Sequence, residues 1–203
     1  VLAAKVYART AEYDGAIAEH LMSAFSDDLD ELSDEMPDEL LVQSSLSQTL
    51  RYGENPHQRA GLYGKFDEYF KQLHGKALSY NNILDVTAAA NLICEFTEDP
   101  PTLAILKHTN PCGMGQGVNL KEAWDKAFAT DNQAPFGGII AMNQPLDGEC
   151  VGAISEIFSE VIIAPEFSAE ALEILQKKKN LRLLKVLKDP FRAVAWDVRN
   201  TGA

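Results

Sequence analysis

Four short apolar runs, separated by stretches with helical periodicity, fill the second half of this 203-residue sequence. The runs are TLAILKH (102–108), GGIIAMN (137–143), VIIAP (161–165) and LRLLKVL (181–187). They lack the polar alternation of a half-exposed strand, so we expect both of their faces to be buried. The stretches between them are LKEAWDKAFAT (120–130), ECVGAISEIF (149–158) and AEALEILQKKK (169–179). Strands that alternate with helices predict an α/β fold, with a mostly parallel sheet covered by helices.

The first half of the chain is less regular. A helix is predicted in the first 25 residues, with Thr10 as its N-cap. Its apolar stripe consists of Tyr13, Ile17, His20, Leu21 and Phe25. Short strands are predicted within 39–48, where the strand leads into a serine-rich loop, and within 59–64. A second helix is predicted over 85–96, with Asp85 as its N-cap and the prolines at 100 and 101 as its stop.

The charge of the chain is concentrated in one segment. Its net charge is −12, and eight of its thirty acidic residues lie within 27–39, where there is no lysine or arginine. A segment of this composition has too little apolar surface to offset its ordering entropy, so residues 26–39 are predicted to be a mobile, dispensable insertion; a docking tail is the alternative. An acidic chain also lacks the basic face that a nucleic-acid partner requires.

Three features of the sequence indicate the setting of the protein: its compartment, its relation to membranes and its place in a longer chain. Its three cysteines are widely spaced, which favours a reduced, cytoplasmic protein. No apolar run is long enough to cross a bilayer, so no membrane partner is expected. The sequence begins with Val1 in place of an initiator methionine, and we therefore expect it to start inside a longer protein.

The adjacent pair Lys107-His108 is the sharpest candidate for chemistry. It ends an apolar strand, where solvated lysines are rare, and it precedes a Thr-Asn-Pro-Cys-Gly turn. Ligands of open α/β folds bind at the rim of the sheet, outside the carboxyl ends of strands. A neighbouring positive charge and partial burial both favour a neutral histidine, which is able to accept a proton. The pair is therefore interpreted as an acid–base pair of an active site.

Glycine- and asparagine-rich turns recur at 50–58, 78–82, 107–117 and 134–139, and together they are typical of binding loops. Arg51 and Tyr52 combine a planar charged fork with a phenolic donor, which suits a phosphate anchor. Gly137 and Gly138 would let a ligand approach the backbone. None of these turns has the spacing of a triphosphate or dinucleotide loop, so neither site is expected.

A zinc site is weighed and rejected. Pro111-Cys112 matches half of the Pro-Cys-x-x-Cys signature of zinc deaminases. Gly115 stands where the second cysteine would be, and the sequence contains no His-x-Glu. The sequence therefore predicts no zinc.

Five motifs carry a resemblance to a known family. LRYGENPHQ, LSYNN, KHTNPCG, FGGIIAMN and EVIIAP, in this order, resemble the transformylase half of the AICAR formyltransferase/IMP cyclohydrolase family. The resemblance implies formyl transfer from 10-formyltetrahydrofolate, as co-substrate, to the amine of AICAR during purine biosynthesis. It also implies a cytidine-deaminase-like α/β/α unit without zinc, and a homodimer with active sites between subunits.

The resemblance also assigns roles to residues. His108 would take the proton from the AICAR amine, and Lys107 would stabilise the oxyanion or protonate the leaving folate nitrogen. The positions that match substrate contacts are Arg51, Tyr52, Asn81, Asn82, Gly137 and Glu160.

The implied domains are 1–45, a linking helix and acidic segment after a cyclohydrolase domain; 46–190, the first deaminase-like unit; and 191–203, a poorly matching tail. Because the chain contains only the first deaminase-like unit, we expect it to be inactive in formyl transfer by itself. A non-catalytic nucleotide-binding module is the alternative, and a zinc-free nucleoside deaminase ranks last because no glutamate is suitably placed.

Protein purified without chelators is expected to contain no stoichiometric zinc, because the second cysteine and the His-x-Glu are missing. Metal analysis by mass spectrometry measures this directly, and one zinc per chain would overturn the prediction.

Overall fold

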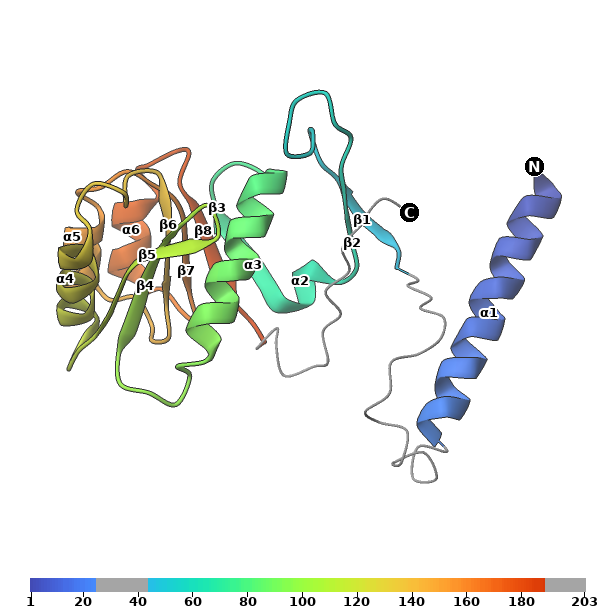
Figure 1. Cartoon of the computed structure of the whole chain (residues 1–203), viewed down its shortest axis with the longest axis horizontal. Coiled ribbons are helices and arrows are strands. Elements are labelled where there is room, and N and C mark those ends of the chain that lie inside the picture. The colour runs from blue at the N-terminus through green and yellow to red at the C-terminus, as the bar shows by residue number, and fades with distance from the viewer. Residues whose placement is uncertain (25–43, 189–203) are drawn as a thin grey trace. The chain divides into compact units, whose positions relative to one another are not determined.

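The computed structural model describes residues 1–24 and 44–188 (Figure 1). The predictions for Phe25, for the acidic segment 26–39 and for the tail 191–203 lie outside the described residues. The chain divides into two compact units, Val1–Gln43 and Ser44–Ala203, and each is considered by itself. No helix in the described part of the chain is both long and apolar enough to span a membrane.

The described part of the first unit is one helix, α1 (Leu2–Ala24), which confirms the predicted helix. It begins well before Thr10, so Thr10 is not its cap; the Thr10 hydroxyl donates to the Tyr7 carbonyl at 3.0 Å instead. The predicted stripe remains largely exposed, with Tyr13 at 67%, Ile17 at 40% and Leu21 at 46%.

A six-stranded sheet with the order β3-β8-β7-β6-β4-β5 forms the centre of residues 44–188. Its strands are β3 (Phe70–His74), β4 (Thr102–Lys107), β5 (Asn110–Gln116), β6 (Gly138–Met142), β7 (Ser159–Ala164) and β8 (Arg182–Val186). A separate antiparallel pair, β1 (Leu46–Thr49) and β2 (Gly61–Tyr63), precedes it. The strand predicted within 59–64 corresponds to β2. For 39–48, residues 39–43 lie outside the described residues, and β1 begins at Leu46, within the serine-rich stretch that was expected to form a loop.

Helices cover both faces of the six-stranded sheet (Figure 1). They are α2 (Phe66–Tyr69), α3 (Tyr80–Cys94), α4 (Leu120–Thr130), α5 (Gly148–Ile154) and α6 (Ala169–Leu175). Leu103 and Ile105 of β4 pack in a core with α4, α5 and α6, whereas Ala104 and Leu106 pack in a second core with α3. The three-layer α/β fold is therefore confirmed, and burial of both faces explains the uninterrupted apolar runs.

The sheet is mixed, which corrects the expectation of a mostly parallel one. The pairs β6–β7 and β7–β8 are parallel, whereas β3–β8, β4–β5 and β4–β6 are antiparallel. The cause is β5, which lies within the predicted 107–117 loop. Because β4 reverses directly into β5, α4 starts from β5 and returns the chain antiparallel to β4. Pro111 is tolerated in β5 because β5 is an edge strand.

Helix α3 begins at Tyr80, five residues before the predicted start, so Asp85 is not its N-cap. Ser79 is the cap: its hydroxyl accepts from the Asn82 N–H, and the Asn82 side chain accepts from the Ser79 N–H. This capping box accounts for two of the unpaired N–H groups at the helix start. The LSYNN stretch, predicted as a loop, is the beginning of the helix.

The glycines of β5 allow α4 to lie close to the strand. A Cβ at Gly113 would lie 2.1 Å from the Ala127 carbonyl oxygen, and one at Gly115 would lie 2.2 Å from that of Ala123. These glycines serve packing between helix and strand, rather than the approach of a ligand.

We predict that Gly115→Ala destabilises the chain by roughly 1–3 kcal/mol, because the new methyl meets backbone that cannot move aside cheaply. At roughly 2–4 °C for each kcal/mol, thermal unfolding followed by circular dichroism should resolve the loss. The matched control is Gly152→Ala, since Gly152 lies inside α5 with nothing within 4 Å of its Cβ position. That change should stabilise the helix by about 0.5–1 kcal/mol. Equal melting temperatures for the two variants would contradict the packing argument.

Candidate functional site

A cavity of about 900 Å³ lies beside the strand ends on one side of the six-stranded sheet. It is lined by Gln48, Thr49, Leu50, Arg51, Tyr52, Lys76, Ala77, Leu78, Ser79, Asn81, Asn82, Asp85, His108, Gly137, Glu160 and Arg182. Seven of the eight predicted site residues are among them; the exception is Lys107. Segments that are distant in sequence thus meet around one space.

The topology of the sheet determines this meeting. His108 follows the carboxyl end of β4, whereas Gly137, Glu160 and Arg182 lie at the amino ends of β6, β7 and β8. These ends are adjacent because β4 runs antiparallel to β6. The expectation of a site at carboxyl ends therefore holds for β4 alone.

His108 lies in a strained turn. Lys107 pairs with Asn110, so His108 and Thr109 form a two-residue connection, and their φ angles are 53° and 64°. Positive φ at both positions defines a type I′ turn, which normally uses asparagine and glycine. A left-handed conformation costs an ordinary residue roughly 1–2 kcal/mol. The Asp85 carboxylate accepts the Thr109 N–H at 2.8 Å, and the Asn110 amide donates to the His108 carbonyl at 2.8 Å.

Lys107 lies beside the cavity rather than in its wall. Its ammonium donates to the Phe136 carbonyl at 2.9 Å, next to Gly137. An ammonium has three donors, so this bond leaves two for other groups. Lys107 also contributes to a lowered pKa of the Asp131 carboxyl, whose main causes are the N–H groups of Ala134 and Gln133. Gly137 has a φ of 75°, which favours glycine at this position.

The two predicted asparagines differ in availability. Asn82 is only 7% exposed, and its side-chain oxygen is committed to Ser79 in the capping box. Asn81 is exposed at the cavity wall. A ligand would therefore meet Asn81, whereas Asn82 shapes the helix start.

Arg51 and Tyr52 stack on each other, with the guanidinium carbon 5.5 Å from the ring centroid. Backbone bonds on both sides hold their loop: Leu50 N–H to the Ala60 carbonyl at 3.1 Å, and Gly53 N–H to the Gln58 carbonyl at 3.0 Å. The guanidinium is exposed, so its donors remain accessible. Such stacking orients an arginine without consuming its fork.

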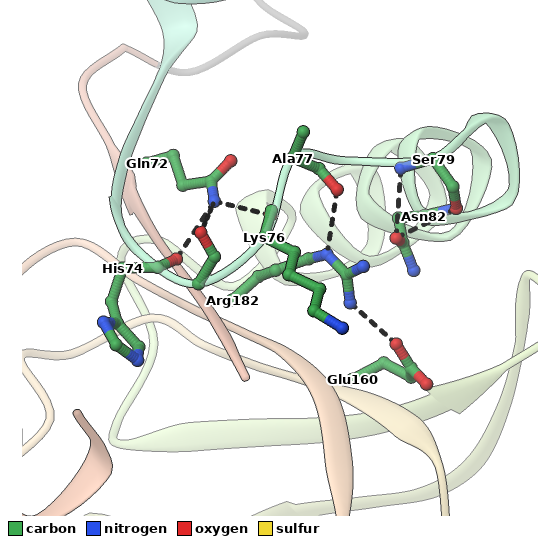
Figure 2. A network of polar contacts seen from close by, with 9 residues as sticks. Gln72, His74, Lys76, Ala77, Ser79, Asn82, Glu160 and Arg182 are labelled. Atoms are coloured by element: carbon green, nitrogen blue, oxygen red, sulfur yellow. Dashed lines mark hydrogen bonds and ion pairs between the residues drawn. The ribbon is translucent and has the colours of Figure 1, made fainter. Parts of the chain in front are cut away.

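Sequence reasoning missed a polar network in the cavity wall, which Figure 2 shows. Arg182 donates to Glu160 at 2.8 Å and contacts the Ala77 carbonyl at 3.4 Å, and its side chain is only 11% exposed. The Gln72 amide bonds the carbonyls of His74, Gly75 and Lys76, which holds the neighbouring turn. The sequence contains a signal for Arg182. It is a charged residue near the start of the apolar run LRLLKVL, just as Lys107 is a charged residue near the end of TLAILKH.

Neither Cys112 nor Cys150 is activated as a nucleophile. Burial raises the pKa of the Cys112 thiol, which contacts the Ile105 carbonyl at 3.4 Å. Burial also raises the pKa of Cys150 to about 12. Nucleophilic attack requires the thiolate, which a raised pKa disfavours. Within residues 1–24 and 44–188, no group of three or more histidine, cysteine or acidic residues is placed to hold a metal ion. The absence of zinc stays a prediction.

Comparison with known proteins places this site in context. A sequence model of the family described as "AICARFT/IMPCHase bienzyme" matches residues 1–203. The chain belongs to this family. It is 51% identical over 200 residues to the bifunctional purine biosynthesis protein PurH of Chloroflexus aurantiacus, covering 98% of this chain and 37% of that protein. It is 47% identical over 208 residues to PurH of Chlorobium chlorochromatii, with 98% and 38% covered.

The chain thus spans less than two fifths of the length of these relatives. Among solved structures, dCMP deaminase of the cyanophage S-TIM5 matches with a TM-score of 0.40 and 9% identity, covering 47% of this chain and 93% of that one. The α/β class rests on the sheet and helices described above.

The ion pair between Arg182 and Glu160 should couple measurably. In a double-mutant cycle of Arg182→Met and Glu160→Gln, we expect a coupling of about 1 kcal/mol in urea unfolding; the half-exposed carboxylate limits it. The matched control is the surface pair Lys121–Asp125, for which about 0.3–0.5 kcal/mol is expected. A smaller coupling for the cavity pair than for the surface pair would contradict the network.

Proposed function

We propose that this chain is part of a bifunctional enzyme of purine biosynthesis and supplies the proton-transfer part of its transformylase site. The reaction is the transfer of a formyl group from 10-formyltetrahydrofolate to the 5-amino group of AICAR, and the longer protein also closes the product to IMP. The observation that carries the proposal is that the motif residues, scattered from Arg51 to Glu160, surround one cavity. The membership of the chain in the family supplies the reaction.

The chemistry requires a base and a source of positive charge. The AICAR amine is a weak nucleophile, because its ring and carboxamide withdraw electrons, so it must lose a proton as the carbon–nitrogen bond forms. His108 faces the cavity and takes that proton. Lys107, with two donors left after its bond to Phe136, stabilises the developing oxyanion or protonates the departing folate nitrogen. Such acid–base help contributes about 10²–10⁴ in rate.

The nucleotide is held by groups of three kinds. The Arg51 fork and the Tyr52 hydroxyl bind the phosphate, because both donate to oxygen and their loop is fixed. Glu160, oriented by Arg182, accepts hydrogen bonds from ribose hydroxyls. Asn81 and the Gly137 backbone complete the wall around the base. The remaining properties follow the family: folate is the co-substrate, the longer protein forms a homodimer, and it is located in the cytoplasm.

A non-catalytic nucleotide-binding module remains the alternative. It would keep the Arg51 and Tyr52 anchor but would have no use for a histidine in a strained turn beside a lysine. Strain of this kind persists where function requires it. The placement of His108 and Lys107 therefore favours catalysis.

The test is His108→Ala in the full-length protein that carries this segment, with tetrahydrofolate release as the readout. We expect AICAR binding, measured by calorimetry, to persist while turnover falls by roughly 10²–10⁴. The matched control is His20→Ala on α1, which should keep normal turnover because His20 is exposed on its helix and lies outside the five motifs that carry the family resemblance.

Turnover of the His108 variant within a few-fold of wild type would refute the base assignment. A wild-type protein that binds AICAR without any formyl transfer would favour the non-catalytic module instead.

A further inference from the structure

The turn that carries His108 is tied to a neighbouring helix by one side chain. The Asp85 carboxylate of α3 accepts the Thr109 N–H at 2.8 Å, across 24 positions of sequence. In a two-residue hairpin the central N–H groups lie outside the ladder formed by the flanking pair. Asp85 therefore binds a donor that the hairpin itself leaves without a ladder partner.

The local sequence does not favour this turn. Both central residues have positive φ, yet neither is glycine or asparagine, and Thr109 is β-branched. A β-branched residue in this region is a genuine outlier that surrounding structure must hold in place. The contacts within the turn, from Thr109 and Asn110 to the His108 carbonyl, do not reach the rest of the fold. The bond from Asp85 does.

Asp85 is itself well fixed. It lies in the second turn of α3, whose start is set by the capping box of Ser79 and Asn82. The buried residues Val86, Ala89 and Ala90 pack α3 onto the sheet. Asp85 and His108 also line the same cavity. The helix can therefore act as a rigid support for the turn.

We propose that Asp85 is a positioning residue for His108. Its hydrogen bond to the Thr109 N–H holds the turn in the left-handed conformation and so presents the imidazole to the cavity. This inference rests on the proposed function, because it assumes that the position of His108 matters for turnover. A displacement of a catalytic group by about 1 Å can cost ~10²-fold in rate.

The first experiment compares Asp85→Ala with Asp85→Asn in the full-length protein. Alanine removes the acceptor, whereas asparagine keeps an oxygen that can accept the Thr109 N–H and removes only the charge. We expect alanine to lower kcat for formyl transfer by roughly 10–10²-fold, with the KM for AICAR nearly unchanged. Asparagine should stay close to wild type. An equal loss in both variants would mean that the carboxylate charge acts directly, and this would overturn the positioning role.

The second experiment adds Thr109→Gly to Asp85→Ala. Glycine adopts positive φ without steric cost, so the turn should no longer depend on Asp85, and most of the lost kcat should return. Failure of this rescue, in a double variant that melts like wild type, would overturn the proposal. The double variant also covers the case in which Asp85→Ala alone folds poorly.

A structural measurement separates this inference from the proposed function. In the 203-residue chain, amide hydrogen exchange at 108–110 should be faster in Asp85→Ala than in Asp85→Asn. If wild type lacks formyl transfer, the proposed function fails, while the exchange result still decides whether Asp85 holds the turn. If wild type is active and Asp85→Ala keeps full kcat, the positioning inference alone fails.

Discussion

Burial of the central sheet on both faces is the constraint on which the rest of residues 44–188 depends. Strands β4, β6 and β7 are almost entirely buried, because one set of alternate side chains packs against α4, α5 and α6 and the other against α3. Burial of apolar surface contributes roughly 25 cal/mol per Å², so this double burial is the main favourable contribution to the free energy of folding. It leaves only the ends of the strands open to a ligand, so polar side chains gather there.

The early reversal of the chain decides which ends meet. Because β4 turns directly into β5, His108 comes to the amino ends of β6, β7 and β8, where Gly137, Glu160 and Arg182 lie. A fully parallel sheet would have placed His108 at the opposite edge from these residues. The mixed topology and the composition of the cavity are therefore one property of the fold.

Most of this fold could be predicted from the sequence, and the exceptions have physical causes. Uninterrupted apolar runs identify buried strands, and the helical periodicity of 120–130 identifies α4. Strand β5 was missed because proline and glycine are depleted in strands, and only its edge position and the packing of α4 explain them. The start of α3 was missed because the asparagine in its capping box favours turns as strongly as caps. Predicted site residues came from motifs, whereas Arg182 and Asp85 act through partners that are distant in sequence.

The strain at His108 follows from the same architecture. A turn of Asn-Gly at 108–109 would adopt positive φ at little cost, but it would place no imidazole at the cavity. The His-Thr turn instead costs roughly 1–2 kcal/mol for each left-handed residue. The β4–β5 ladder on one side and the capped helix α3 on the other can offset that cost, since each is stabilised by burial remote from the turn. A rigid support on both sides thus permits a conformation that a free loop would not keep, and His108 occupies it.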